Sequence, residues 1–72
     1  MSLNQSVSIQ VNGEALKVPE NSSVADVVVL LNLENQRIAV ELNQEIVPRS
    51  QHGTVVLKNS DVLEVVTAIG GG

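Results

Sequence analysis

The sequence predicts an α+β fold in which a mixed sheet of four to five strands is covered on one face by a single helix. One observation is composition: the 72 residues include fourteen valines and no aromatic side chain, and β-branched residues favour strands. The other is patterning, because apolar and polar residues alternate with period two in several short segments, whereas a single segment has helical spacing. The predicted core is therefore aliphatic.

A hairpin opens the chain. Apolar and polar residues alternate over 6–11, and the run ends at Asn12-Gly13, a dipeptide typical of a tight hairpin turn. Leu16 and Val18 continue the alternation on the second strand until Pro19, which has no N–H to donate to a sheet.

The next segment, Ser23 to Asn32, is predicted to be a helix. Either Ser22 or Ser23 can cap it, and Asp26 lies in the first turn, where the helix dipole favours a negative charge. Its apolar residues at helical spacing are Val24, Val27, Val28 and Leu31. A strand over 27–31 competes with this interpretation because β-branched residues lower helix propensity.

Alternation returns over 38–42, which predicts a third strand that Asn43-Gln44 interrupts. Residues 45–47 precede Pro48 and suit a short edge strand. We expect edge strands and loops in this part of the chain, with an irregular polar loop over 50–53 that precedes the segment 54–58.

A turn at 59–61 leads into the last strand, Val62 to Thr67, with Leu63 and Val65 facing inward. The first and last strands can pair in parallel at the centre of the sheet, because the intervening helix supplies the crossover that a parallel pair needs. This architecture is β-grasp-like. We expect one domain over residues 1–67 and a flexible C-terminal tail over 68–72.

Composition also excludes several classes of function. The net charge is −4 and no aromatic ring is present, so nucleic acid is not an expected partner. Without cysteine there is neither a disulfide nor a thiolate nucleophile, which fits a cytoplasmic protein. No apolar run is long enough to span a bilayer, so we expect no membrane association.

Residues for catalysis or metal binding are not evident. His52 lies in a polar loop, where a solvated histidine is expected. The carboxylates that would have to converge for acid–base chemistry lie at positions that the strand pattern makes solvent-facing: Glu41, Glu45, Asp61 and Glu64. No histidine and carboxylates share the spacing of metal ligands, so we predict neither a catalytic residue nor a metal site.

The C-terminus ends in three glycines, Gly70, Gly71 and Gly72. Without Cβ atoms, these residues form a thin thread that can enter a narrow channel of another protein. A glycine carboxylate delivered into an ATP-using site can become an acyl adenylate, which a sulfur or nitrogen nucleophile then attacks. The glycines alone are equally compatible with a frayed terminus.

Four segments together resemble the thiamine-biosynthesis sulfur carriers of the ThiS family, which have a ubiquitin-like β-grasp fold. The segments are Asn12-Gly13-Glu14, Ser23-Val24-Ala25-Asp26, Asn43-Gln44-Glu45-Ile46-Val47-Pro48-Arg49-Ser50, and the end of the chain from Leu63 to Gly72. The resemblance spans almost the whole chain, and the Ile46–Arg49 stretch with a terminal diglycine is its most specific part. One departure is Asn59-Ser60-Asp61, where the family more often has an Asp-Gly-Asp turn.

The resemblance implies that Gly72 is adenylated with ATP by an activating enzyme of the ThiF type and converted to a thiocarboxylate. A cysteine desulfurase would supply the sulfur, and a thiazole synthase of the ThiG type would receive it. The protein would then be a carrier and cosubstrate with no cofactor of its own, and Gly70 and Gly71 would enter the partner's active site. The molybdopterin-type sulfur carriers and the ubiquitin-like protein modifiers share the fold and the tail, and they are the alternatives.

A carrier that visits two enzymes needs a modest, transient interface near its tail. Val62, Glu64, Val66 and Ala68 share the outer face of the last strand. We expect these residues to form the partner interface, although ordinary apolar surface accounts for them equally well.

Overall fold

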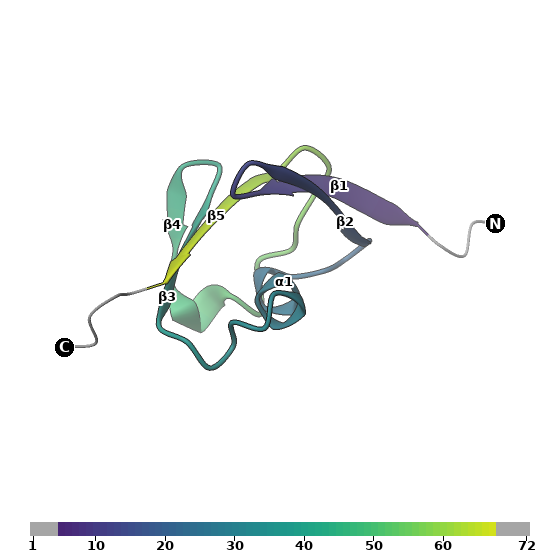
Figure 1. Ribbon diagram of the computed structural model, residues 1–72. Coiled ribbons are helices and arrows are strands. Elements are labelled where there is room, and N and C mark those ends of the chain that lie inside the picture. The colour runs from purple at the N-terminus through teal and green to yellow at the C-terminus, as the bar shows by residue number, and fades with distance from the viewer. Residues whose placement is uncertain (1–4, 68–72) are drawn as a thin grey trace.

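The computed structural model describes residues 5–67. Its elements are β1 (Ser6–Val11), β2 (Glu14–Pro19), α1 (Val24–Leu30), β3 (Ile38–Leu42), β4 (Glu45–Val47), the 3₁₀ turn η1 (Arg49–Gln51) and β5 (Val62–Thr67). Figure 1 shows α1 packed below a curved sheet. The predicted α+β fold is thus confirmed, with five strands in the sheet.

The sheet has the order β2-β1-β5-β3-β4, so the last strand of the chain lies at its centre. β5 pairs in parallel with β1 and antiparallel with β3, and both hairpins are antiparallel. The predicted central pairing of the first and last strands is therefore confirmed. The helix between them makes the crossover that a parallel pair requires.

An aliphatic core lies between the sheet and α1. Every strand contributes its inward-facing, alternate side chains to this core. Leu63 of β5, which has no exposed surface, lies in the middle of the core. The buried set is Val7, Ile9, Val11, Val18, Val24, Val27, Val28, Val40, Val47, Leu57, Leu63 and Val65. Among residues 5–67, no helix covers the other side of the sheet, which we call the uncovered face. Its outward residues on β3, β4 and β5 are Ala39, Glu41, Ile46, Val62, Glu64 and Val66.

The helix is shorter than predicted but has the predicted cap and buried face. Ser23 is the N-cap: its hydroxyl accepts a hydrogen bond from the Asp26 N–H at 3.2 Å, and the Asp26 carboxylate accepts from the Ser23 N–H at 2.9 Å. The helix ends at Leu30 rather than at Asn32, because Asn32 has a positive φ of 61° that ends the helical conformation. The competing strand over 27–31 is wrong. Within residues 5–67, no helix is long and apolar enough to cross a membrane.

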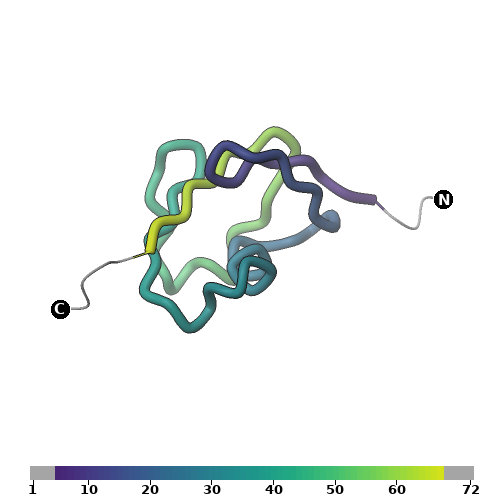
Figure 2. Tube along the Cα trace, in the orientation of Figure 1, coloured from purple at the N-terminus to yellow at the C-terminus, as the bar shows by residue number. Residues whose placement is uncertain are grey.

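The segment from Pro48 to Lys58 runs beside α1 before the chain returns to β5, as Figure 2 shows. It forms no strand apart from one bridge between Ser23 and Val56. Its backbone carbonyls instead satisfy the start of the helix: the N–H groups of Val24 and Ala25 donate to the carbonyls of residues 55 and 52 at 3.0 and 2.8 Å.

The prediction that His52 is solvated is wrong. The side chain is only 8% exposed, because η1 turns the ring inward, where its Nε2–H donates to the Val47 carbonyl at 3.1 Å. A polar neighbourhood in the sequence does not reveal such a partner, since Val47 lies on an earlier strand. The ring therefore joins η1 to the end of β4.

Both edge strands stop at a proline. β2 ends with Pro19, and Pro48 directly follows the three-residue strand β4. Because proline cannot donate a backbone hydrogen bond, neither edge can be extended along the chain. This arrangement confirms the predicted edge position of β4.

One turn residue is strained by its conformation. Ser60 has a φ of 72°, a region that favours glycine, and its N–H donates to the Ser8 carbonyl at 2.8 Å. Replacing Ser60 by Gly keeps this hydrogen bond and removes the Cβ penalty. We expect S60G to raise the free energy of unfolding by about 0.5–1 kcal/mol, measured by urea denaturation.

The matched control is Ser8→Gly, on the partner strand, where the backbone is extended and glycine weakens a strand interior. S8G should lower the free energy of unfolding by about 0.5–1 kcal/mol. If S60G unfolds at a lower urea concentration than the wild type, backbone strain at this turn is refuted.

Candidate functional site

The site is built around the C-terminal half of β5, the strand that leads toward the end of the chain. On one side, β3 accompanies β5 to its last residue, with Ile38 opposite Thr67. On the other side, β1 pairs only as far as Val11 opposite Leu63. The second half of β5 therefore extends past the end of β1 and lies beside the β1–β2 turn.

The Asn12 side chain continues the β1 side of this ladder. Its Oδ1 accepts from the Val65 N–H at 2.8 Å, and its Nδ2 donates to the Val65 carbonyl at 3.1 Å. An amide side chain thus takes the place that a further peptide group of β1 would occupy. The geometry depends on the positive φ of Asn12, 52°, at the first position of the hairpin turn.

Asn43 does the same at the start of β5, on the opposite side. Its Oδ1 accepts from the Val62 N–H at 3.0 Å, its own N–H donates to the Val62 carbonyl at 2.8 Å, and its Nδ2 donates to the Asp61 carboxylate at 3.0 Å. Its φ is also positive, at 51°. Two turn asparagines therefore hold β5 from its two sides, one near each end.

The predicted interface residues of β5 lie on the uncovered face. Val62, Glu64 and Val66 are exposed there, Val66 by 64% of its surface. Ala68, the fourth residue, lies outside the described residues, as do Gly70, Gly71 and Gly72. The shared outer face of Val62, Glu64 and Val66 agrees with the sequence prediction, whereas the interface itself stays a prediction.

Sequence reasoning missed the rest of this face. The β3–β5 register places Ala39 beside Val66 and Glu41 beside Glu64, and the β3–β4 register places Ile46 beside Glu41. Ile46 is 70% exposed. Strand periodicity identifies which face each residue occupies but not which residues are neighbours, because register depends on the turns.

The four carboxylates predicted to face solvent divide into two groups. Glu45 and Glu64 are exposed, as predicted, whereas Glu41 and Asp61 are half-buried. Asp61 is partly covered because its carboxylate closes the 58–61 turn, accepting from the Lys58 N–H at 2.7 Å. Between residues 5 and 67, no three or more histidine and acidic side chains gather in a way that could hold a metal ion.

Comparison with known proteins relates the chain to sulfur carriers. A family model described as the ThiS family matches residues 2–72. The sulfur carrier protein ThiS of Bacillus subtilis is 34% identical over 65 residues, which are 89% of this chain and 98% of that protein. The crystal structure of the thiamine biosynthesis protein ThiS from Geobacter metallireducens matches with a TM-score of 0.77 and 28% identity, covering 92% of this chain and 100% of that one.

A second kind of relative is much longer. The thiazole synthase of Paramagnetospirillum magneticum is 35% identical over 66 residues, which are 92% of this chain but only 20% of that protein. That synthase thus contains a region similar to this whole domain. The structural match with the Geobacter protein confirms the predicted β-grasp fold.

The Asn12 contacts yield a direct test. Asn12→Gly keeps the positive φ accessible and removes both side-chain hydrogen bonds to Val65. We expect N12G to lower the free energy of unfolding by about 1–2 kcal/mol and to speed hydrogen exchange of the Val65 amide, measured by NMR.

The control is the Val62 amide, whose N–H donates to the Asn43 side chain. In N12G, its hydrogen exchange should become faster only by the amount that the loss of global stability explains. Asn43→Gly should have the opposite effect: hydrogen exchange of the Val62 amide becomes faster, and that of the Val65 amide changes only with global stability. Unchanged protection of Val65 in N12G would show that the asparagine amide does not hold the strand.

Proposed function

This chain belongs to the ThiS family of sulfur carriers, and from that premise we propose that it carries sulfur for thiamine biosynthesis as a thiocarboxylate at Gly72. The observation that supports the proposal most is the family match, which runs over residues 2–72 and so includes the three terminal glycines. β5, fixed at the centre of the sheet, leads toward this end.

The chemistry begins with activation, because a carboxylate is a poor acyl donor. In the site of a ThiF-type enzyme, a Gly72 carboxylate oxygen attacks the α-phosphorus of ATP, pyrophosphate leaves and an acyl adenylate forms. A sulfur nucleophile at the oxidation level of sulfide then attacks the acyl carbon, AMP leaves with the electrons of the C–O bond, and the thiocarboxylate remains. ATP is used by the partner, so this chain needs no cofactor of its own.

The glycines before the reacting residue determine access. Gly70 and Gly71 have no Cβ, so the thread can pass through a channel too narrow for other residues. A cysteine desulfurase supplies the sulfur in this proposal as a persulfide, and a thiol reduces that sulfur to the oxidation level of sulfide and is itself oxidised to a disulfide. The carrier itself acts as a cosubstrate whose folded part presents the tail.

The acceptor that we propose is a thiazole synthase of the ThiG type. The support comes from thiazole synthases that contain a region similar to this chain, over 20% of their own length. Proteins that act in succession are sometimes joined in one chain, which raises the effective concentration of each for the other. We propose that the contact with this acceptor is modest in area and transient.

Mass spectrometry after incubation with ATP, the cognate activating enzyme and sulfide tests the proposal. Exchange of oxygen for sulfur adds about 16 Da, nominally the same as oxidation of Met1. Cleavage after Lys58 separates the two, because the fragment 59–72 contains the tail and no methionine. We expect the added mass on this fragment only when ATP is present.

The matched control is the chain that ends at Gly70, which lacks the last two glycines but keeps every described residue. It should fold normally and gain no mass. Sulfur on the truncated chain would contradict a role for Gly72, and conjugates to amines in place of a thiocarboxylate would support a protein modifier instead.

A further inference from the structure

The β1–β2 turn contains a chemically reactive pair of residues, Asn12 and Gly13. Gly13 is the only glycine of the chain that directly follows an asparagine. Both residues are exposed, and apart from the chain neighbours of Gly13 no atom lies within 4 Å of the point that its Cβ would occupy. The Gly13 nitrogen is therefore free of the crowding that a side chain at this position would cause.

The Asn12 side chain, in contrast, is held in place by a distant strand. Its Oδ1 accepts from the Val65 N–H at 2.8 Å, and its Nδ2 donates to the Val65 carbonyl at 3.1 Å. The two residues are 53 positions apart in the chain, so these contacts exist only while the second half of β5 lies against the turn. Both polar atoms of the amide are then engaged.

We propose that Asn12 is a deamidation site, and that its two hydrogen bonds to Val65 prevent the reaction until the end of β5 detaches from the turn. Detachment of a strand end is a local opening, which needs less free energy than unfolding of the whole domain. The inference is independent of the proposed function, because it uses only the chemistry of the turn and the pairing of β5.

The reaction needs no reagent other than water. The Gly13 nitrogen loses its proton and bonds to the side-chain carbon of Asn12, the bond from that carbon to Nδ2 breaks, and ammonia leaves with the electron pair and a proton. Water then opens the resulting succinimide at either carbonyl, which yields aspartate or isoaspartate. Because the amide carbon becomes tetrahedral and Nδ2 departs, the paired contacts with Val65 must break.

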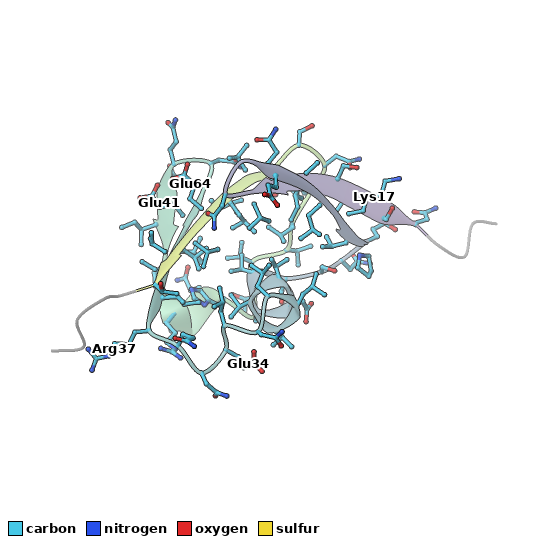
Figure 3. All side chains as sticks on the ribbon, viewed as in Figure 1. Lys17, Glu34, Arg37, Glu41 and Glu64 are labelled. Carbon is cyan, nitrogen blue, oxygen red and sulfur yellow. The ribbon has the colours of Figure 1, made fainter. Side chains whose placement is uncertain are left out.

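The product cannot restore both contacts. A carboxylate has no hydrogen to donate, so the oxygen that replaces Nδ2 faces the Val65 carbonyl oxygen and repels it. Figure 3 shows Lys17, the one cation of the β1–β2 hairpin, well along β2 from the turn, whereas Glu64 lies on β5 next to Val65. The new negative charge therefore joins existing ones, and the end of β5 stays less firmly attached.

The test compares three forms of the full chain: wild type, Val65→Ala and the matched control Val28→Ala. Val65 and Val28 are equally buried core residues, 7% and 6% exposed, but Val28 lies on α1. The proteins are incubated in mildly alkaline buffer, because the Gly13 nitrogen must lose its proton.

Two rates are measured on each protein. Deamidation adds about 1 Da and one negative charge, so ion exchange separates the product. Tandem mass spectrometry of the fragment 1–17, released by cleavage after Lys17, then locates the change at Asn12. Hydrogen exchange of the Val65 amide is measured by NMR, since its N–H donates to the same side chain.

We expect Asn12 to deamidate in the urea-unfolded wild type and at least about tenfold more slowly in the folded protein. V65A should speed the reaction of the folded protein about tenfold, because it weakens the packing of β5. V28A should leave the rate near that of the wild type. Across the three chains, the deamidation rate should rise in proportion to the exchange rate of the Val65 amide.

Three results would overturn the inference. The absence of reaction at Asn12 in the unfolded chain would show that it is not a deamidation site. Equal rates in the folded and unfolded wild type would show that the hydrogen bonds do not protect the amide. An equal increase in V28A and V65A would assign the reaction to global unfolding. If V65A does not fold, the proportionality is tested on the wild type over a series of low urea concentrations, where its absence likewise refutes the inference.

Discussion

The central position of β5 is the constraint on which the rest of the structure depends. This strand comes last in the chain, yet it lies between β1 and β3, which come earlier in the sequence. Its pairing with β1 is short, and the Asn12 amide extends it where the backbone of β1 turns away. Asn43, in the β3–β4 turn, fixes the start of β5, and Asn12, in the β1–β2 turn, fixes how far β5 stays hydrogen-bonded on its β1 side.

The aliphatic core follows from the same arrangement. Because the domain is small and has no aromatic side chain, valine and leucine must fill the space between sheet and helix, and the helix itself is rich in valine. Such a helix has low intrinsic propensity. It is stabilised instead by its capping box and by the carbonyls of the 52–55 segment, which accept hydrogen bonds from its first turn.

The strands and the helix could be predicted because their signals are local. Alternation identified the inward residues of β1, β3 and β5, and the Ser23–Asp26 spacing identified the start of α1. The buried His52 could not be predicted, because its hydrogen-bond partner, Val47, is brought near only by η1. The Glu41–Glu64 neighbours were equally inaccessible, since the register of β3 against β5 is set by pairing between distant segments. Sequence reasoning thus located one strand of the candidate site and missed its neighbours.

The prolines that end both outer strands have a consequence for self-association. Open sheet edges tend to recruit the edge of another molecule and so begin ordered aggregates. Here Pro19 ends β2 and Pro48 directly follows the three-residue strand β4, and exposed apolar side chains such as Ile46 and Val66 lie on the uncovered face of the sheet. Growth of the sheet beyond either proline would place a residue without an N–H donor in the ladder, which opposes edge-to-edge pairing between molecules.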